Sequence, residues 1–349
     1  METIRIGIVG CGNWGPNLIR NFVELPGSQV VTVADLRESR LRHVRSKYPG
    51  IQTTRDYREL FKMDLDAAVV VTQPASHFAI ARDFLQHGLG VLLEKPLTLC
   101  SRDAEELIEL ATRRGLCLMT GHTLEYNPAV RALKDLIQQG VVGRVLHISS
   151  VRTNSDLLQR EVDVLWDLAP HDVSMLLYLL GQEPVSVSAT AGSYLHPDLL
   201  DVVHLNIQYA DGTTAHVHVS WIKPCKTRRL TVVGSNKTVV FDDVSPDQKI
   251  KIYEMRDHPQ SKARSGGELS RSNHNEDPVI PDVELVEPLR LECEDFLRSV
   301  ASGEEPQCGG QSGLRVVKIL EAANRSLNNG GVFELVMPME RFVDEPARI

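Results

Sequence analysis

The stretch IRIGIVGCGNWGP, residues 4–16, decides the fold of the first part of this 349-residue chain. Its first six residues form a mostly apolar run typical of a buried strand, and three glycines follow at the spacing of a dinucleotide-binding turn. Gly10 permits the tight turn out of the strand, Gly12 lets the backbone approach a pyrophosphate, and Gly15 lets the next helix pack on the strand. The alternative is a tight strand-to-helix turn without a ligand.

The same alternation continues to about Thr120. Continuously apolar, β-branched runs alternate with helical patterns, which predicts parallel strands covered by helices on both faces. Two of the helices are expected over residues 76–87 and 101–114, each with a glycine at its end. The expected strands are residues 4–9, 30–34, 67–72, 91–93 and 116–120.

After a helix that starts at Asn127-Pro128 and closes at Gly140, short strands joined by tight turns favour an antiparallel sheet. We therefore predict an α/β Rossmann domain with a doubly wound parallel sheet over residues 1–122. An α+β domain with an open-faced, mainly antiparallel sheet follows over residues 123–349. Its expected elements are strands 145–151, 185–191, 202–209, 214–221, 230–233, 238–241 and 250–253, an apolar helix 173–180, two late helices 288–301 and 313–327 that are free to pack back on the first domain, and a returning strand 333–337.

The segment 256–282 is rich in serine, asparagine, proline and charge. It has too little apolar surface to form a core of its own, so we expect an excursion or a lid.

Composition is typical of a soluble globular protein, with 42% hydrophobic and 24% charged residues. A formal net charge of -8 argues against a nucleic-acid partner. No apolar run reaches the roughly 20 residues that a membrane-spanning helix needs, and the N-terminus lacks a signal-peptide pattern, so we expect a cytoplasmic protein. The six cysteines are scattered, which favours reduced thiols and offers no structural metal site.

A second strand ends at Asp35, whose carboxylate can accept the hydroxyls of an adenosine ribose and repel a 2'-phosphate. NAD is therefore the expected cofactor, although Arg37 and Arg40 could pair with the phosphate of NADP. The loop after residue 71 lies where the nicotinamide half would bind, with a helix start capped by Ser76 as the alternative. The expected cofactor-binding residues are Gly10, Gly12, Asn13, Trp14, Gly15, Asp35, Arg37, Thr72, Pro74, His77, Glu94 and Lys95.

Lys95 stands between Glu94 and Pro96, directly after the apolar run 91–93 and at the carboxyl edge of the expected sheet. A lysine there seldom serves packing, so we interpret it as a catalytic group. The alternative is a solvated surface lysine paired with Glu94. Pro96 favours the catalytic interpretation because it fixes the chain where Lys95 must be aimed.

The segment WDLAPHD, residues 166–172, stands ahead of the apolar helix. Because Pro170 suits a first helical turn, His171 and Asp172 are expected to project from a helix start, with Asp167 just before it. An imidazole oriented by a carboxylate can exchange a hydroxyl proton near neutral pH. The alternatives are an interior hydrogen-bonded histidine and a carboxylate that only complements the helix dipole.

The glycine motif, then Glu94-Lys95-Pro96, then Asp167-x-x-x-His171 resemble, in that order, the Gfo/Idh/MocA oxidoreductases, which use nicotinamide cofactors on sugars and polyols. The resemblance covers nearly the whole chain and implies a Rossmann domain followed by an open-faced sheet. It also implies that Lys95 lies beside the nicotinamide, that His171 is the acid/base, and that Asp167 places the substrate or the imidazole.

Residues 166–172 and 220–229 are more similar to family members of bacterial surface-polysaccharide and lipid A pathways, although Ala169 and residues 125–128 depart from the commoner family pattern. Those members oxidise C3 of UDP-N-acetylglucosamine or its uronic acid before an aminotransferase acts. The basic residues within 223–229 also suit a diphosphate, with a solvated strand edge as the alternative. The expected substrate-binding residues are Arg152, Asn154, Asp172, Lys226 and Arg228, with Arg160 as a further candidate.

The leading hypothesis is NAD-dependent oxidation of the C3 hydroxyl of a UDP-N-acetylated sugar, with the product passed to an aminotransferase. A dehydrogenase of a free sugar or polyol, a ketosugar reductase and a non-catalytic nicotinamide-binding sensor are the rivals, and Lys95 and His171 could exchange roles. The open sheet face favours a homodimer or homotetramer. His216 and His218 share one strand face, and we assign them to sheet packing or an oligomer contact and not to a metal.

Overall fold

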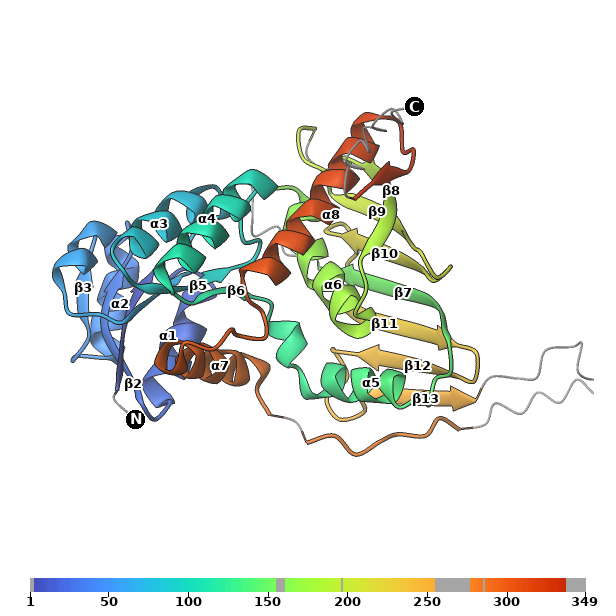
Figure 1. Cartoon of the computed structure of the whole chain (residues 1–349), viewed down its shortest axis with the longest axis horizontal. Helices are drawn as coiled ribbons and strands as arrows, with labels where there is room; N and C mark the ends of the chain where they lie inside the picture. The colour runs from blue at the N-terminus through green and yellow to red at the C-terminus, as the bar shows by residue number, and fades with distance from the viewer. Residues whose placement is uncertain (1–2, 155–160, 196, 255–276, 285, 337–349) are drawn as a thin grey trace, which may run out of the picture.

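A computed structural model describes residues 3–154, 161–195, 197–254, 277–284 and 286–336. Two sheets, each with its own helices, lie beside each other, and the late helix α8 (Gly310–Asn328) lies between them (Figure 1). Arg160 and most of the expected excursion 256–282 lie outside the described residues. Within the described ranges, no helix is long and apolar enough to cross a membrane.

The first sheet is six-stranded and wholly parallel, in the order β3-β2-β1-β4-β5-β6, which confirms the predicted doubly wound sheet. Its central strands are buried on both faces, as their continuously apolar sequences require. The strands are β1 (Ile4–Val9), β2 (Ser28–Ala34), β3 (Gln52–Thr54), β4 (Ala67–Val70), β5 (Gly90–Glu94) and β6 (Leu118–Gly121), and the helices are α1 (Gly15–Glu24), α2 (Glu38–Lys47), η1 (Tyr57–Lys62), α3 (Pro74–Gln86), α4 (Ser101–Arg114) and η2 (Thr123–Tyr126).

The second sheet is eight-stranded, in the order β13-β12-β11-β7-β10-β9-β8-β14. Its pairs are antiparallel except for β7 with β10, so the sheet is mixed but mainly antiparallel. The strands are β7 (Val145–Thr153), β8 (Pro184–Gly192), β9 (Val202–Tyr209), β10 (Thr214–Ser220), β11 (Thr227–Gly234), β12 (Lys237–Asp242), β13 (Ile250–Glu254) and β14 (Glu334–Leu335).

Helices cover only one face of this second sheet among the described residues: α5 (Pro128–Gln138), α6 (Val164–Leu180) and α8 (Gly310–Asn328) (Figure 1). Strand β9 shows the consequence, because Val203, Leu205 and Ile207 are buried on the helix side while His204 and Asn206 point the other way. The open face expected from the sequence is therefore present.

Helix α6 corrects one expectation. It begins at Val164 and not at Val173, because the Asp163 side chain caps it by accepting from the backbone N–H of Trp166 at 3.2 Å. Pro170 consequently lies inside the helix and not in its first turn. Asp167 and His171 then stand four residues apart on one helix, which places them on the same face.

The two late helices pack back on the first half of the molecule, and α8 also contacts the second sheet. Helix α7 (Pro288–Ser302) packs against α1, with the rings of Phe22 and Phe296 edge to face at 6.2 Å. Helix α8 packs against α4 on one side and α6 on the other. Helix α8 therefore helps to fix how the first sheet lies against the second, while the division into domains 1–122 and 123–349 stays a prediction.

Candidate functional site

The glycine loop after β1 has the geometry that its sequence predicts. Gly10 adopts a φ of 97°, and a Cβ atom there would lie 2.4 Å from the carbonyl oxygen of Val71. A Cβ at Gly15 would lie 2.4 Å from the carbonyl oxygen of Gly10, so only glycine lets α1 start this close to the strand. The loop therefore brings backbone N–H groups and the positive end of α1 to the sheet edge, where they suit a diphosphate.

Asp35 follows β2 and lies beside that loop. Its carboxylate accepts hydrogen bonds from the backbone N–H groups of Cys11 at 2.9 Å and Arg37 at 2.8 Å, and it pairs with the Arg40 guanidinium at 3.3 Å. Burial raises the pKa of Asp35, but these hydrogen bonds and Arg40 outweigh it and leave the pKa below its usual value. Asp35 is thus a fixed anion at the position where a ribose would bind.

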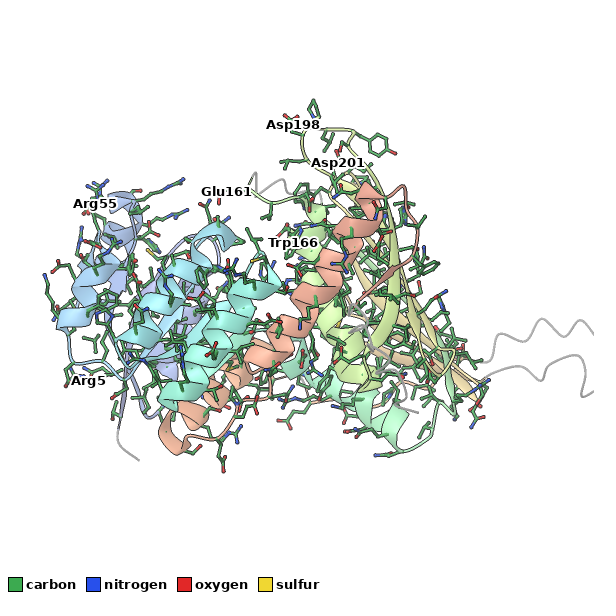
Figure 2. All side chains as sticks on the ribbon, turned by 45° about the horizontal axis from the view of Figure 1, so that its top comes forward. Arg5, Arg55, Glu161, Trp166, Asp198 and Asp201 are labelled. Carbon is green, nitrogen blue, oxygen red and sulfur yellow. The ribbon has the colours of Figure 1, made fainter. Side chains whose placement is uncertain are left out.

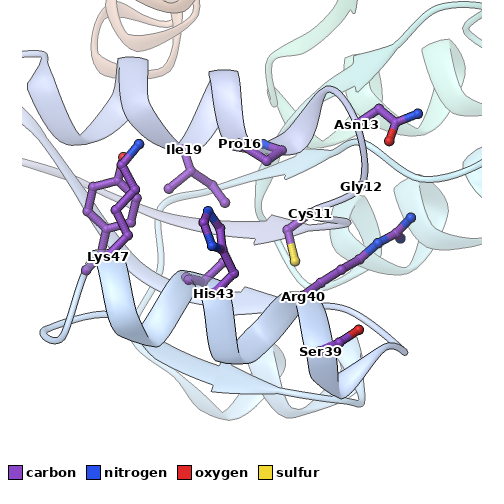
Figure 3. Close-up of a pocket in the computed structure, with 11 residues that line it drawn as sticks. Cys11, Gly12, Asn13, Pro16, Ile19, Ser39, Arg40, His43 and Lys47 are labelled. Atoms are coloured by element: carbon purple, nitrogen blue, oxygen red, sulfur yellow. The ribbon is translucent and has the colours of Figure 1, made fainter.

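A cavity of about 260 Å³ lies between the start of α1 and the side of α2 that faces it, next to Arg40, which pairs with Asp35 (Figure 3). Arg40 and His43 of α2 line one side, and Gly12, Asn13 and Pro16 line the other. A Cβ at Gly12 would come within 3.4 Å of the Arg40 guanidinium, so the small residue keeps this space open. These residues fit the adenosine and diphosphate portions of a dinucleotide.

Thr72 lies in the loop between β4 and α3, and Pro74 and His77 lie in the first turn of α3. Helix α3 begins at Pro74, and Gln73 occupies the cap position without a capping side-chain hydrogen bond. Ser76 lies inside the helix and is therefore not its cap. His77 is fully buried, and its ring nitrogens lie 2.8 Å from the carbonyl oxygen of Pro96 and 3.1 Å from that of Thr72. His77 therefore ties this loop to the Lys95 loop, while Thr72, which is partly exposed, is available at the sheet edge.

Lys95 reaches across from the first sheet to helix α6. Its Nζ atom donates to the backbone carbonyl oxygen of Asp167 at 2.6 Å and lies 3.4 Å from Oδ1 of the same residue. The other carboxylate oxygen of Asp167 accepts a hydrogen bond from the indole N–H of buried Trp221 at 3.2 Å. Asp167 is thus held by both neighbours and orients the Lys95 ammonium.

His171 lies one turn further along α6. Its Nδ1 atom is buried without a hydrogen-bond partner among the described residues. Burial lowers the pKa of His171 well below its ordinary value, and the positive charges of Lys95 and then Arg152 lower it further. The imidazole is therefore neutral near pH 7, close to Lys95, and able to accept a proton.

Arg152 and Asp172 form a buried ion pair at 2.7 Å, with side-chain exposures of 5% and 2%, and Ser150 donates to the same carboxylate at 2.6 Å. Arg152 and Asp172, which were both predicted to bind the substrate, therefore pair with each other, and Asp172 is the residue next to His171 in the chain. Asn154 follows β7, and its backbone N–H donates to the carbonyl oxygen of Ser220. Trp166, near the start of α6, lies between the two halves of the molecule (Figure 2).

The basic cluster of β11 divides over the two faces of the sheet. Arg228 is on the helix side with Arg152, is partly buried, and pairs with Asp243 at 3.4 Å. Arg229 is on the opposite side with Asp242, and Lys226 is exposed in the loop before β11. Arg228 is therefore the member of the cluster that lies near His171, whose pKa it also lowers.

Sequence reasoning missed three polar residues near Lys95. Trp221 supports Asp167, and His122, after β6, is fully buried with both ring nitrogens unpartnered among the described residues. Glu292 of α7 is also fully buried. Of these three residues, only Trp221 could have been found from the sequence, because it ends the predicted strand 214–221 and belongs to the segment 220–229 that resembles other family members. The described residues contain no group of His, Cys, Asp and Glu that could hold a metal ion.

Comparison with known proteins identifies the family to which this chain belongs. Residues 4–122 match the model described as "Oxidoreductase family, NAD-binding Rossmann fold", and residues 130–240 match the GFO/IDH/MocA C-terminal domain. The chain is 27% identical to UDP-N-acetylglucosamine 3-dehydrogenase of Acidithiobacillus ferrooxidans, over 91% of this chain and 95% of that protein. It is 25% identical to myo-inositol 2-dehydrogenase of Thermotoga maritima, over 93% and 96%.

A solved structure of the Acidithiobacillus ferrooxidans 3-dehydrogenase superposes with a TM-score of 0.79 at 25% identity, covering 94% of this chain and 99% of that one. The first sheet, its glycine loop and its helices are thus an NAD-binding Rossmann fold, and the cofactor is NAD. With both parts of the chain matched, the protein belongs to the Gfo/Idh/MocA family of oxidoreductases.

Proposed function

We propose that the protein oxidises the C3 hydroxyl of a UDP-N-acetylated sugar, with UDP-N-acetylglucosamine as the leading substrate. The observation that carries the proposal is the contact between Lys95 Nζ and Asp167, which brings the sheet edge to the turn of α6 that presents His171. An ammonium and a neutral imidazole near one point suit removal of a hydroxyl proton and stabilisation of the oxygen left behind.

NAD bound at the glycine loop supplies the hydride acceptor. His171, which is neutral, takes the proton from the hydroxyl oxygen, and Lys95 stabilises the charge that develops on that oxygen. Asp167 orients Lys95 through its carbonyl and carboxylate oxygens. The buried Arg152–Asp172 pair anchors α6 to β7 at the residue next to His171, and so helps to hold the imidazole in position.

Arg228 supports a nucleotide-sugar substrate because it is a cation on the same side of the sheet as His171, in a chain with net charge -8. Guanidinium groups bind phosphate oxygens in a bidentate manner. Asp243 holds Arg228 in place, and exposed Lys226 lies two residues before it. The similarity to UDP-N-acetylglucosamine 3-dehydrogenase points the same way.

The competing substrate is a free polyol, because the similarity to myo-inositol 2-dehydrogenase is almost as strong. We would mix the protein and NAD with UDP-N-acetylglucosamine, its uronic acid or myo-inositol, follow reduced nicotinamide by absorbance, and locate the keto carbon by NMR. Turnover of the UDP-sugars supports the proposal, and turnover of myo-inositol alone contradicts it. No turnover of any alcohol would favour a nicotinamide-binding sensor.

The variant Arg228→Leu separates the two substrate classes. A UDP-sugar should lose roughly tenfold or more in kcat/KM, because a lost charged contact costs about 1.5–3 kcal/mol. A free polyol should lose little. Arg229→Leu, on the opposite face of the same strand, is the matched control and should leave both reactions unchanged.

The open face of the second sheet supports a homodimer or homotetramer. The rings of His204 and His218 stack there at 4.3 Å, and those of His204 and His216 at 5.6 Å. These histidines suit a contact between copies, which light scattering of the purified chain would measure. A 3-keto sugar product is a substrate for transamination, so an aminotransferase is the expected next enzyme of a lipid A or surface-polysaccharide pathway.

A further inference from the structure

Trp221 directly follows β10 and is almost fully buried, with 2% of its surface exposed. Its indole N–H donates to Oδ2 of Asp167 at 3.2 Å, across 54 positions of the chain. A buried indole usually has an acceptor for its N–H. Here the acceptor is the same carboxylate that contacts Lys95, so the hydrogen bond reaches the proposed catalytic centre.

Asp167 uses its two carboxylate oxygens for two different donors. Oδ2 accepts from the indole of Trp221, while Oδ1 lies 3.4 Å from Nζ of Lys95. The backbone carbonyl oxygen of Asp167 accepts from the same Nζ atom at 2.6 Å. Because the torsion that turns an aspartate carboxylate has a broad energy minimum, a donor on one oxygen is needed to fix where the other lies. The indole therefore sets the position of the oxygen that faces Lys95.

The second sheet holds Trp221 in place without help from Asp167. The backbone N–H of Trp221 donates to the carbonyl oxygen of Asp201 at 2.9 Å. Asp201 is fully buried, and its Oδ2 atom accepts from the backbone N–H groups of Tyr194 at 2.7 Å and Leu195 at 2.6 Å. The indole is thus a fixed donor, and the Asp167 carboxylate adjusts to it.

The indole is also a neutral donor, which matters beside an ion pair. The side chains of Lys95 and Asp167 are 16% and 17% exposed, so solvent screens their attraction only in part. A second cation on Oδ2 would share the negative charge of the carboxylate with Lys95. Trp221 instead satisfies that oxygen as a donor without charge. Among the described residues, the ion pair that Asp167 forms is the one with Lys95.

We propose that Trp221 is a positioning residue for the oxidation, whose indole N–H holds Asp167 in the orientation that aims the Lys95 ammonium at the substrate oxygen. In this role Trp221 touches neither substrate nor cofactor, and it acts through Asp167. The role rests on the proposed oxidation of an alcohol, but not on which sugar or polyol is oxidised. An ammonium that points elsewhere stabilises the developing charge less, and small displacements of a positioned group strongly lower the rate.

The first test is Trp221→Phe, which keeps an aromatic ring and removes the N–H. We expect kcat to fall about tenfold or more, because a misplaced group loses much of its effect. The NAD dissociation constant should stay within about twofold of the wild type, because the glycine loop belongs to the first sheet. Tyr209→Phe is the matched control, since it removes the hydroxyl of a buried ring at the opposite end of β9 and should leave kcat unchanged. Unchanged kcat in Trp221→Phe would overturn the proposal.

A double-mutant cycle with Asp167→Ala separates positioning from simple support of the fold. If Trp221 acts through Asp167, then Trp221→Phe has nothing left to position once Asp167 is alanine. It should then change kcat by less than about twofold in that background. A purely structural role for the indole lowers kcat by the same factor in both backgrounds, and this result would also overturn the proposal.

The indole N–H resonance of Trp221 in NMR spectra gives a readout that needs neither turnover nor a change at Trp221. The chain has three tryptophans, so Trp14→Phe and Trp166→Phe assign the Trp221 peak by elimination. Lys95→Ala frees Oδ1 of Asp167, and the Trp221 peak should shift because both groups share that carboxylate. An unmoved peak would mean that Trp221 and Lys95 are not linked.

This readout keeps the proposal testable if Trp221→Phe fails to fold, because every variant that it uses retains Trp221. It also separates the two levels of inference. Wild-type protein that oxidises no alcohol would refute the proposed function, while a shifted Trp221 peak in Lys95→Ala would still support the link through Asp167. Normal turnover by the wild type with an unmoved peak would refute the positioning role alone.

Discussion

The Nζ atom of Lys95 lies 2.6 Å from the backbone carbonyl oxygen of Asp167, although the two residues are 72 positions apart in the chain. One belongs to the edge of the first sheet and the other to the helix that covers the second. Because His171 follows Asp167 by one helical turn, this single hydrogen bond sets how close the ammonium and the imidazole come. The packing of the two halves of the molecule thus determines the candidate catalytic geometry.

Replacing Lys95 tests its part in the chemistry. Lys95→Ala should lower kcat by about 10²–10⁴, the usual contribution of a positioned acid–base group. NAD binding, followed by fluorescence titration, should stay measurable. Lys62→Ala is the control, because Lys62 is 73% exposed and pairs only with nearby Glu59 in the described contacts. Normal turnover by Lys95→Ala would remove the residue from the mechanism.

The glycine loop should tolerate no side chain at Gly15. Gly15→Ala would place a Cβ 2.4 Å from the Gly10 carbonyl oxygen, so α1 must shift away from the strand. We expect a loss of about 1–3 kcal/mol of unfolding free energy and at least tenfold weaker NAD binding, measured by denaturation and calorimetry. Gly50→Ala meets no atom within 4 Å and is the matched control. Equal NAD affinity in both variants would argue against the loop as the cofactor site.

Removing one partner of the buried pair of Arg152 and Asp172 should strongly lower the stability of the protein. Asp172→Ala leaves a buried guanidinium without its counter-charge and should cost about 3–5 kcal/mol of unfolding free energy. Urea denaturation measures the loss. Glu109→Ala breaks the exposed pair with Arg113 and should cost less than about 1 kcal/mol. Similar losses in the two variants would show that the Arg152 site is open to solvent.

His122 should make the fold sensitive to acid. Its pKa in the folded protein is lowered to about 3, mainly by burial, whereas the unfolded chain takes up a proton there below about pH 6.5. Its stabilising contribution is therefore complete above pH 6.5 and is lost as the pH falls toward 3. We expect the stability of the wild type to fall more steeply than that of His122→Gln over this range, by up to about 1.4 kcal/mol per pH unit. Urea unfolding at pH 6.5, 5.5 and 4.5 measures the two slopes, and equal slopes would mean that His122 is not held neutral.

Local sequence patterns were enough to predict most of the fold. The parallel sheet was predictable because buried parallel strands must be continuously apolar, and the glycine spacing fixes the first turn. Strand β3 and helix α2 were missed, because β3 has three residues and α2 consists largely of charged ones. The start of α6 was misplaced because Pro170 was taken as a first-turn proline. The capping side chain of Asp163, followed by an apolar run, was the better signal.

The candidate site was only partly predictable. The motifs singled out Lys95 at a strand end, where it lies, but Asp167 was expected ahead of the helix and His171 at its start, and both lie inside α6. The pairing of Arg152 with Asp172 was not predictable, because it depends on β7 packing against α6. Glu292 has no local signal at all, since nothing in the sequence of α7 tells which of its glutamates is buried. Such contacts follow from tertiary packing alone.

The most direct test uses UDP-N-acetylglucosamine that carries deuterium at C3. Wild-type protein and Lys95→Ala are each incubated with this substrate and NAD, and the reduced cofactor is examined by mass spectrometry. We expect deuterium on the nicotinamide formed by the wild type and essentially none with Lys95→Ala. Reduced cofactor without deuterium in the wild type, or equal labelling in both proteins, would contradict C3 oxidation at the Lys95 site.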